Sequence, residues 1–178
     1  MTKNSLYTLL VLAIQPSASI AVELNGQEFF TNPPTNISIN SAYKNAYQRS
    51  YPVISFELPR DAGANLKQIS LLQISGTQTW DWRTSKTSVY EGPYNLRKKG
   101  KTGLAKIKID DKQKSIRIIF TPSIKPGQTA SVVIPSNNPR QGIYEWSSSF
   151  YPDSKLSIPS KSLGPVLRLS IYKLNNDY

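Results

Sequence analysis

The sequence of 178 residues contains no cysteine and no histidine. Without cysteine there is no disulfide, no thiolate metal site, no cysteine nucleophile and no lipid-bearing cysteine of the lipoprotein type. Without histidine the usual general base near neutral pH and the commonest transition-metal ligand are absent, which excludes serine–histidine–aspartate chemistry. The fold must therefore depend on packing, and few catalytic arrangements remain.

Long apolar runs are also scarce. One from Leu6 to Ile14 follows Lys3 and precedes small residues at Ser19 and Ala21. A positive start, an apolar stretch too short to span a bilayer and small residues at these positions predict a signal peptide over residues 1–21. We expect export through the general secretory route to the periplasm or outside, with no transmembrane segment in the mature chain.

Helical periodicity is hard to find after this leader. Short alternating runs bounded by Pro, Gly, Asn and Ser recur instead, which is typical of a sandwich or small barrel. We predict one all-β domain over residues 22–178, an antiparallel β-sandwich, immunoglobulin-like or related, with helix considered only at 42–49 and near Asp61. The expected strands are 53–58, 66–75, 105–109, 115–120, 129–134, 142–150 and 166–173. The Ser-rich and Pro-rich stretch 147–162 is predicted to be a long surface loop.

Acidic residues are few, 11 against 22 Lys and Arg, and ten of the basic residues fall between Arg97 and Lys125. In the hairpin 105–120, alternation predicts an apolar face and a basic face. The apolar face comprises Ile107, Ile109, Ile116, Ile118 and Phe120, and the basic face comprises Lys106, Lys108 and Arg117. If Ile109 lies opposite Ile116, Lys108 lies opposite Arg117, a like-charge pair that costs about a few tenths of a kcal/mol.

Two explanations of this basic face stay open. An acidic side chain elsewhere in the fold, or water and salt, neutralises it. Alternatively, it binds an anionic partner: an envelope polysaccharide, lipid headgroups or an acidic protein, but not nucleic acid, for which no motif is visible. The candidate anion-binding residues are Arg97, Lys98, Lys99, Lys101, Lys106, Lys108 and Arg117.

The sequence Trp80-Asp81-Trp82-Arg83 places two indoles on one side of a strand, with Tyr90 and Tyr94 close behind. Paired tryptophans on a strand are most often sandwich core. The alternative is a carbohydrate-binding module in which Trp80, Trp82, Tyr90 and Tyr94 form a glycan platform. That alternative requires exposed indoles and salt-tolerant binding.

No pattern supports catalysis. Glu57, Glu91 and Glu145 fall on or beside expected strands, but no spacing pairs them as a glycosidase acid and nucleophile. We therefore expect a non-enzyme with no catalytic residue, metal or cofactor. A third possibility is a structural or assembly subunit that acts through an unpaired edge strand.

Several short sequences occur in a familiar order: Phe56-Glu57-Leu58-Pro59, Ala62-Gly63, Tyr90-Glu91-Gly92, Phe120-Thr121-Pro122, Pro126-Gly127-Gln128-Thr129, Asn138-Pro139, Gly142 and Tyr144. In this succession the chain resembles a family of exported cyanobacterial proteins catalogued as domain of unknown function 2808, over roughly Glu28 to Lys173. The resemblance implies a secreted, mainly β domain. It supplies no catalytic or binding residues, and this chain is more basic around Arg97 to Lys108 than the family pattern implies.

Overall fold

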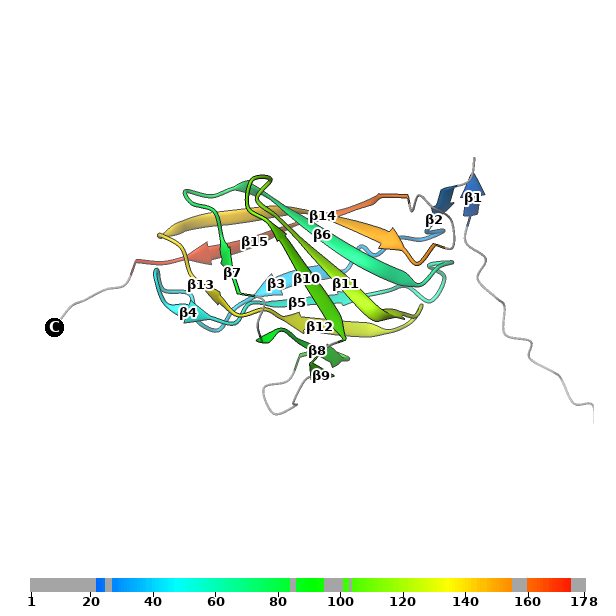
Figure 1. Cartoon of the computed structure of the whole chain (residues 1–178), viewed down its shortest axis with the longest axis horizontal. Coiled ribbons are helices and arrows are strands. Elements are labelled where there is room, and N and C mark those ends of the chain that lie inside the picture. The colour runs from blue at the N-terminus through cyan, green and yellow to red at the C-terminus, as the bar shows by residue number, and fades with distance from the viewer. Residues whose placement is uncertain are drawn as a thin grey trace, which may run out of the picture.

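In the computed structural model, two five-stranded antiparallel sheets pack face to face (Figure 1). The structure describes residues 22–24, 27–83, 86–94, 101–102, 104–154 and 160–173. The strand order is β10-β11-β6-β14-β15 in the first sheet, called sheet 1 below, and β3-β5-β12-β8-β9 in the second, called sheet 2. The predicted signal peptide lies outside the described residues.

The chain passes between the two sheets several times. Sheet 1 contains β6 (Leu66–Ser75), β10 (Ala105–Asp110), β11 (Ser115–Ile124), β14 (Gly142–Pro152) and β15 (Ser162–Ile171). Sheet 2 contains β3 (Ile37–Asn40), β5 (Val53–Glu57), β8 (Ser88–Glu91), β9 (Lys101–Thr102) and β12 (Thr129–Val133). Smaller sheets pair β4 (Arg49–Ser50), β13 (Ser136–Asn137) and β7 (Asp81–Trp82), and β1 (Val22–Leu24) with β2 (Gln27–Phe29).

The core lies between the two sheets and follows from the period-two alternation of the strands. On β11, every second side chain is buried: Ile116, Ile118 and Phe120. Phe120 meets Phe56 of β5 across the sandwich, with ring centroids 5.5 Å apart. Aromatic contacts of this kind bury much apolar area and join the layers.

The predicted all-β antiparallel sandwich is confirmed. Residues 66–75 form a strand with the expected bounds, and the strands expected at 53–58 and 129–134 each end one residue earlier. No α-helix occurs in the described residues, and the stretch 42–49 considered for helix contains a turn at Ala46 and Tyr47 and ends at the start of β4. Asn45 there bridges to Tyr172, and Tyr47 has a positive φ of 61°, which a helix does not allow.

The predicted loop over 147–162 is wrong in its bounds, because the described residues outside the strands there are only 153–154 and 160–161. Its first six residues, 147–152, continue β14, and Ser162 begins β15. The serines are tolerated in the sheet because their hydroxyls find partners: the buried Ser148 donates to the carbonyl oxygen of Pro165 at 2.6 Å. A serine-rich composition therefore indicated a loop where the chain forms hydrogen-bonded strand.

Candidate functional site

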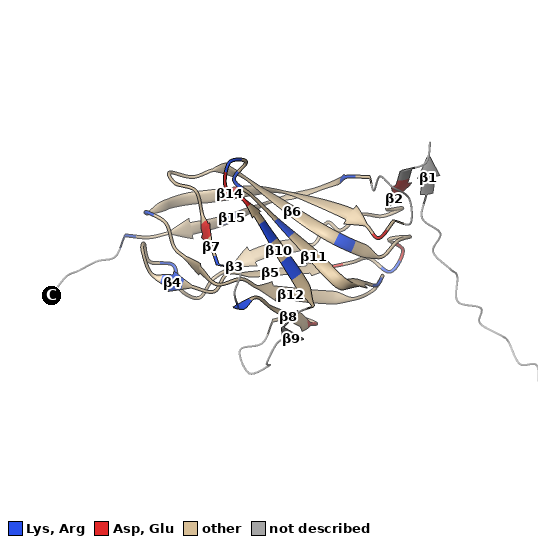
Figure 2. Cartoon of the chain, in the orientation of Figure 1, with Lys and Arg blue, Asp and Glu red and all other residues tan. Residues whose placement is uncertain are grey.

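The basic hairpin is present with the expected register. β10 pairs with β11 so that Ile109 lies opposite Ile116 and Lys108 opposite Arg117. Lys106, Lys108 and Arg117 are all exposed, and Figure 2 shows the cations side by side on β10 and β11. Ile109, expected in the core, is 37% exposed because it lies next to the hairpin turn, at the margin of the sandwich. We call Lys106, Lys108 and Arg117 the cation face.

The carboxylates of the described residues do not pair with the cation face. The ion pairs among the described residues join Lys67 to Asp153 at 4.0 Å, Arg83 to Asp81 at 3.7 Å and Arg168 to Glu145 at 3.7 Å, and none involves the cation face. Asp110 lies two residues from Lys108, but its Oδ1 accepts a hydrogen bond from the backbone N–H of Gln113 at 3.0 Å. Within the described part of the chain, the charges of the cation face are left to solvent or a ligand.

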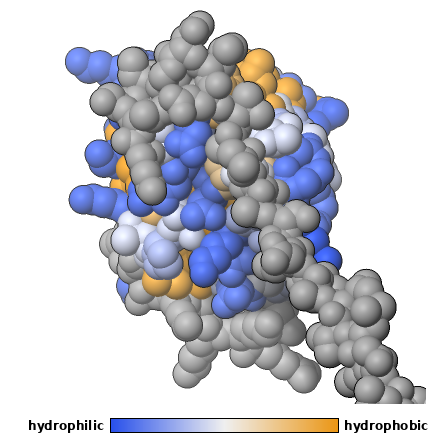
Figure 3. All heavy atoms as spheres, turned by 90° about the vertical axis from the view of Figure 1, so that its right-hand side faces the viewer, coloured by the Kyte–Doolittle hydropathy of each residue, from blue (hydrophilic) through white to orange (hydrophobic). Residues whose placement is uncertain are grey.

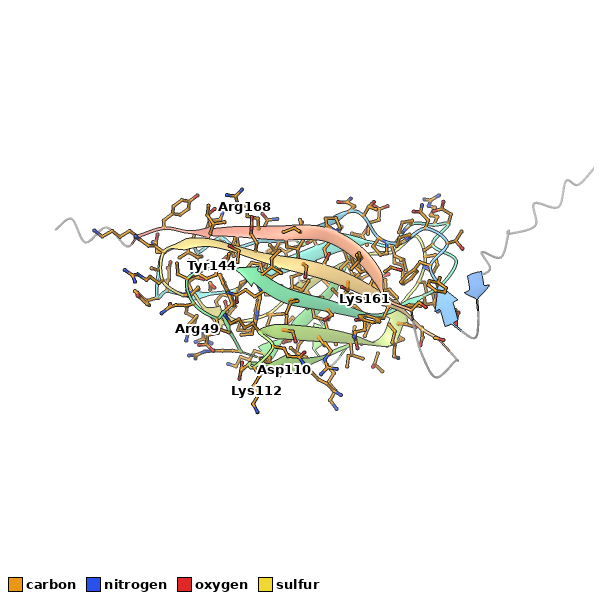
Figure 4. The ribbon with its side chains drawn as sticks, turned by 90° about the horizontal axis from the view of Figure 1, so that it is seen from above. Arg49, Asp110, Lys112, Tyr144, Lys161 and Arg168 are labelled. Atoms are coloured by element: carbon orange, nitrogen blue, oxygen red, sulfur yellow. The ribbon has the colours of Figure 1, made fainter. Side chains whose placement is uncertain are left out.

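The outer side of sheet 1 changes character across the strands. Arg117 is aligned with Ser70 of β6, then Ser149 of β14 and Leu163 of β15. The adjacent row runs from Ser115 through Leu72 and Ser147 to Val166, and Leu72, Val166 and Leu163 are exposed. Figure 4 shows this side from above, with Arg168 at one margin and Asp110 and Lys112 at the other. The cation face thus occupies the β10–β11 side. The β14–β15 side carries serines, aliphatic residues and Arg168, which pairs with Glu145.

Of the seven predicted cations, the structure describes only Lys101, Lys106, Lys108 and Arg117. Arg97, Lys98 and Lys99 lie outside the described residues. Lys101 belongs to β9, which pairs with β8 in sheet 2, so its strand is not part of the hairpin sheet. The candidate anion site therefore rests on Lys106, Lys108 and Arg117.

The Trp80–Trp82 glycan platform is wrong. The two indoles do lie side by side, with centroids 5.6 Å apart, but Trp80 is only 2% exposed and Trp82 only 8%. Both pack against Trp146, which is fully buried, and Trp80 also meets Tyr144 edge to face. The surface of both indoles is buried between the two sheets, so they offer no surface to a sugar.

Tyr90 and Tyr94 are separate from that cluster. Tyr90 lies on β8 in sheet 2, and its ring meets that of Tyr94 at a centroid distance of 5.3 Å and an interplanar angle of 89°. Both side chains are half-buried. Tyr94 also lines a groove with Asn40 and Ser55, two residues that sequence reasoning missed.

The three glutamates do not form a catalytic pair. Glu57 and Glu91 align with consecutive residues of β12, Thr129 and Ala130, whose side chains point to opposite faces. Glu145 belongs to the other sheet and pairs with Arg168. In the described residues there is also no group of three or more acidic side chains placed to hold a metal ion.

The cavity between β8 and the end of β11 is small. It measures about 120 Å³ and is lined mainly by apolar residues, among them Val89, Leu104 and Ile124. Drug-sized ligands occupy pockets of about 300–1,000 Å³. The end of the sandwich seen in Figure 3 is mostly hydrophilic in its described residues, with apolar side chains only in small groups.

The fold and these surfaces define a cysteine-free antiparallel β-sandwich domain. The chain belongs to the family described as Protein of unknown function (DUF2808), which matches residues 27–166. No curated protein sequence matches it. The described residues form no helix with the length and apolar character needed to cross a bilayer.

Several solved structures are similar in fold. The C-terminal domain of the Streptococcus agalactiae AgI/II polypeptide BspA has 8% identity and a TM-score of 0.48, covering 76% of this chain and 50% of that one. An uncharacterised immunoglobulin-like protein from Nocardia farcinica has 13% identity and a TM-score of 0.44, covering 76% and 96%. ACE19, the collagen-binding subdomain of the Enterococcus faecalis surface protein ACE, has 11% identity and a TM-score of 0.45, covering 78% and 97%. The chain spans about half the length of the first of these.

Proposed function

We propose that the protein is an exported, non-catalytic binding domain of the cell envelope that recognises an anionic component through Lys106, Lys108 and Arg117. The observation that carries this proposal is the register of the hairpin. It sets Lys108 opposite Arg117 on an exposed sheet surface where the described residues provide no ion-pair partner. A bound anion removes the repulsion between these two charges.

The energetics favour a weak, salt-sensitive attachment. Each basic residue near an anionic surface contributes about 1 kcal/mol, so three contribute about 3 kcal/mol, or roughly 100-fold in affinity. Lys112 and Lys114 in the hairpin turn add to the same field. The cations lie on an exposed strand pair, and such an open surface suits a repeating polyanion better than a small enclosed anion. An anionic polysaccharide is therefore the first partner class, ahead of lipid headgroups and acidic proteins.

Assembly through an edge strand is the competing role. β10 is an edge of sheet 1, but its two lysines disfavour pairing with another strand. The opposite edge, β15, contains Pro165, which has no N–H to donate, and its end is bridged by Asn45 through Tyr172. Both edges of sheet 1 are thus poor templates for a further strand.

The test is retention on immobilised heparin. The variant Lys106→Glu/Lys108→Glu/Arg117→Glu is compared with Lys44→Glu/Arg140→Glu/Lys173→Glu, which makes the same change in net charge at three exposed cations elsewhere. We expect the first variant to elute at much lower salt than wild type and the control to elute close to it. Equal losses in both variants would show that net charge, and not this surface, sets the retention.

A further inference from the structure

The outer side of sheet 2 carries a groove that is distinct from the cation face. Its volume is about 440 Å³, within the range of small-molecule sites. The floor comes from Val53 and Ser55 on β5 and from the end of β3 at Asn40. The walls come from Ser41 and Ala42 after β3 and from Pro93 and Tyr94 after β8.

The turn after β8 builds the aromatic wall. Gly92 has a φ of +86°, and its N–H donates to the carbonyl oxygen of Thr129 at 2.7 Å. This left-handed residue turns the chain back from β8 toward β5 and β3, which places Tyr94 beside Ser55 in the groove. Tyr90, packed at a right angle to Tyr94, supports that ring.

The hydroxyl groups beneath the groove have defined donor and acceptor roles. Tyr90, Ser131, Ser55 and Ser38 are aligned across sheet 2. Ser131 donates its only hydroxyl proton to the carbonyl oxygen of Gly92 at 3.2 Å, so in its 2.8 Å contact with Ser55 it is the acceptor. Ser55 consequently has its proton engaged and presents lone pairs to the groove. It is an acceptor for a ligand hydroxyl.

The described residues that line the groove are all uncharged. The exposed amide of Asn40 can both donate and accept, Ser55 accepts, and Tyr94 and Pro93 offer flat apolar surface. Few polar groups beside aromatic surface match a ligand with ring hydroxyls and apolar ring faces. We propose that this groove binds a neutral saccharide, with Tyr94 against a sugar ring and with Asn40 and Ser55 bonded to its hydroxyls.

This site differs from the rejected tryptophan platform. It uses Tyr94 with Asn40 and Ser55, and no indole takes part. It also differs from the proposed anion site, because the two lie on the outer sides of different sheets. Its binding should therefore be insensitive to salt and should survive reversal of the cation face.

The test is an NMR titration of the ¹⁵N-labelled protein with three neutral probes: cellotetraose, maltotetraose and N-acetylchitotetraose. We expect at least one probe to give saturable amide shifts at Asn40, Ser55 and Tyr94. The dissociation constant should be unchanged between about 0.1 M and about 1 M salt, where the Debye length falls from about 10 Å to about 3 Å. It should also be unchanged in the triple cation-face variant.

Two variants and a control identify the contacts. Tyr94→Ala should raise the dissociation constant of the probe by about fivefold or more, whereas Tyr94→Phe, which keeps the ring, should bind like wild type. Tyr172→Ala, at an exposed tyrosine elsewhere, is the matched control and should have no effect. The proposal is overturned if no probe gives a saturable shift at about 10 mM, well above a dissociation constant on the order of 1 mM. It is equally overturned if Tyr94→Ala stays folded and binds like wild type.

Discussion

At the scale of single residues, the opposition of Lys108 and Arg117 links stability to the proposed function. Directly opposed side chains in an antiparallel pair lie about 4.5–5.5 Å apart at Cβ, and like charges there repel. Lys106, on the same strand, lies opposite Ile119 and has no such repulsion. The two lysines therefore share a surface and a charge but differ in what their removal does to stability.

The first prediction concerns this difference. Lys108→Glu converts a repulsive pair into an attractive one, so the free energy of unfolding should rise by about 0.2–1 kcal/mol while heparin affinity falls. Lys106→Glu should lower heparin affinity with little effect on stability. Urea unfolding and heparin retention of both variants provide the measurement. A Lys108→Glu protein less stable than wild type would contradict the repulsion on which the argument depends.

The tryptophans show what residue patterns can and cannot decide. Alternation correctly placed Trp80 and Trp82 on one side of the chain, and the structure confirms their contact. Which side faces the core depends on the layer above them, where Trp146 and Tyr144 come from a strand far along the sequence. That information is absent from the local pattern.

At the scale of elements, the contact between β14 and β15 is unusually close. The register shifts between Ser147 and Ser149, opposite the stretch of β15 that contains Gly164 and Pro165. A Cβ at Gly164 would collide with the ring of Phe150 and the hydroxyl of Ser148, both of which are buried. The glycine thus permits the close approach of β14 to β15, the edge strand of sheet 1.

The second prediction follows from this contact. Gly164→Ala should destabilise the protein by about 1–3 kcal/mol, because overpacking forces Phe150 or the strand to move. Ser170→Ala, a small change on the outward side of the same strand, is the control and should change stability much less. Urea unfolding of the two variants tests this, and equal stability of Gly164→Ala and wild type would show that the strands are less tightly apposed.

Element prediction from sequence succeeded where alternation was strong and failed where composition misled. The hairpin 105–120 was predicted with its register because five apolar residues alternate with three cations around a short polar turn. The stretch 147–162 was misjudged because its serines suggest a loop, whereas β14 buries Ser148 and Ser149 between neighbouring strands. The bonding that makes buried serines acceptable depends on strands that sequence alone does not align.

At the scale of the whole molecule, the two sheets present different outer surfaces. Sheet 1 carries the cation face at its β10–β11 side, and sheet 2 carries the groove, whose described lining residues are uncharged. The groove could not be predicted from sequence because Asn40, Ser55 and Tyr94 meet only through the strand order β3-β5-β12-β8. The cation face could be predicted in part, since its three residues belong to one hairpin.

The most direct measurement of the anion proposal is an NMR titration of the ¹⁵N-labelled protein with a heparin hexasaccharide. The account predicts that the largest amide shifts fall on β10 and β11 around Lys106, Lys108 and Arg117. It also predicts that these shifts are lost between about 0.1 M and about 1 M salt. Shifts concentrated on other strands, or shifts at the hairpin that persist unchanged at the higher salt, would contradict it.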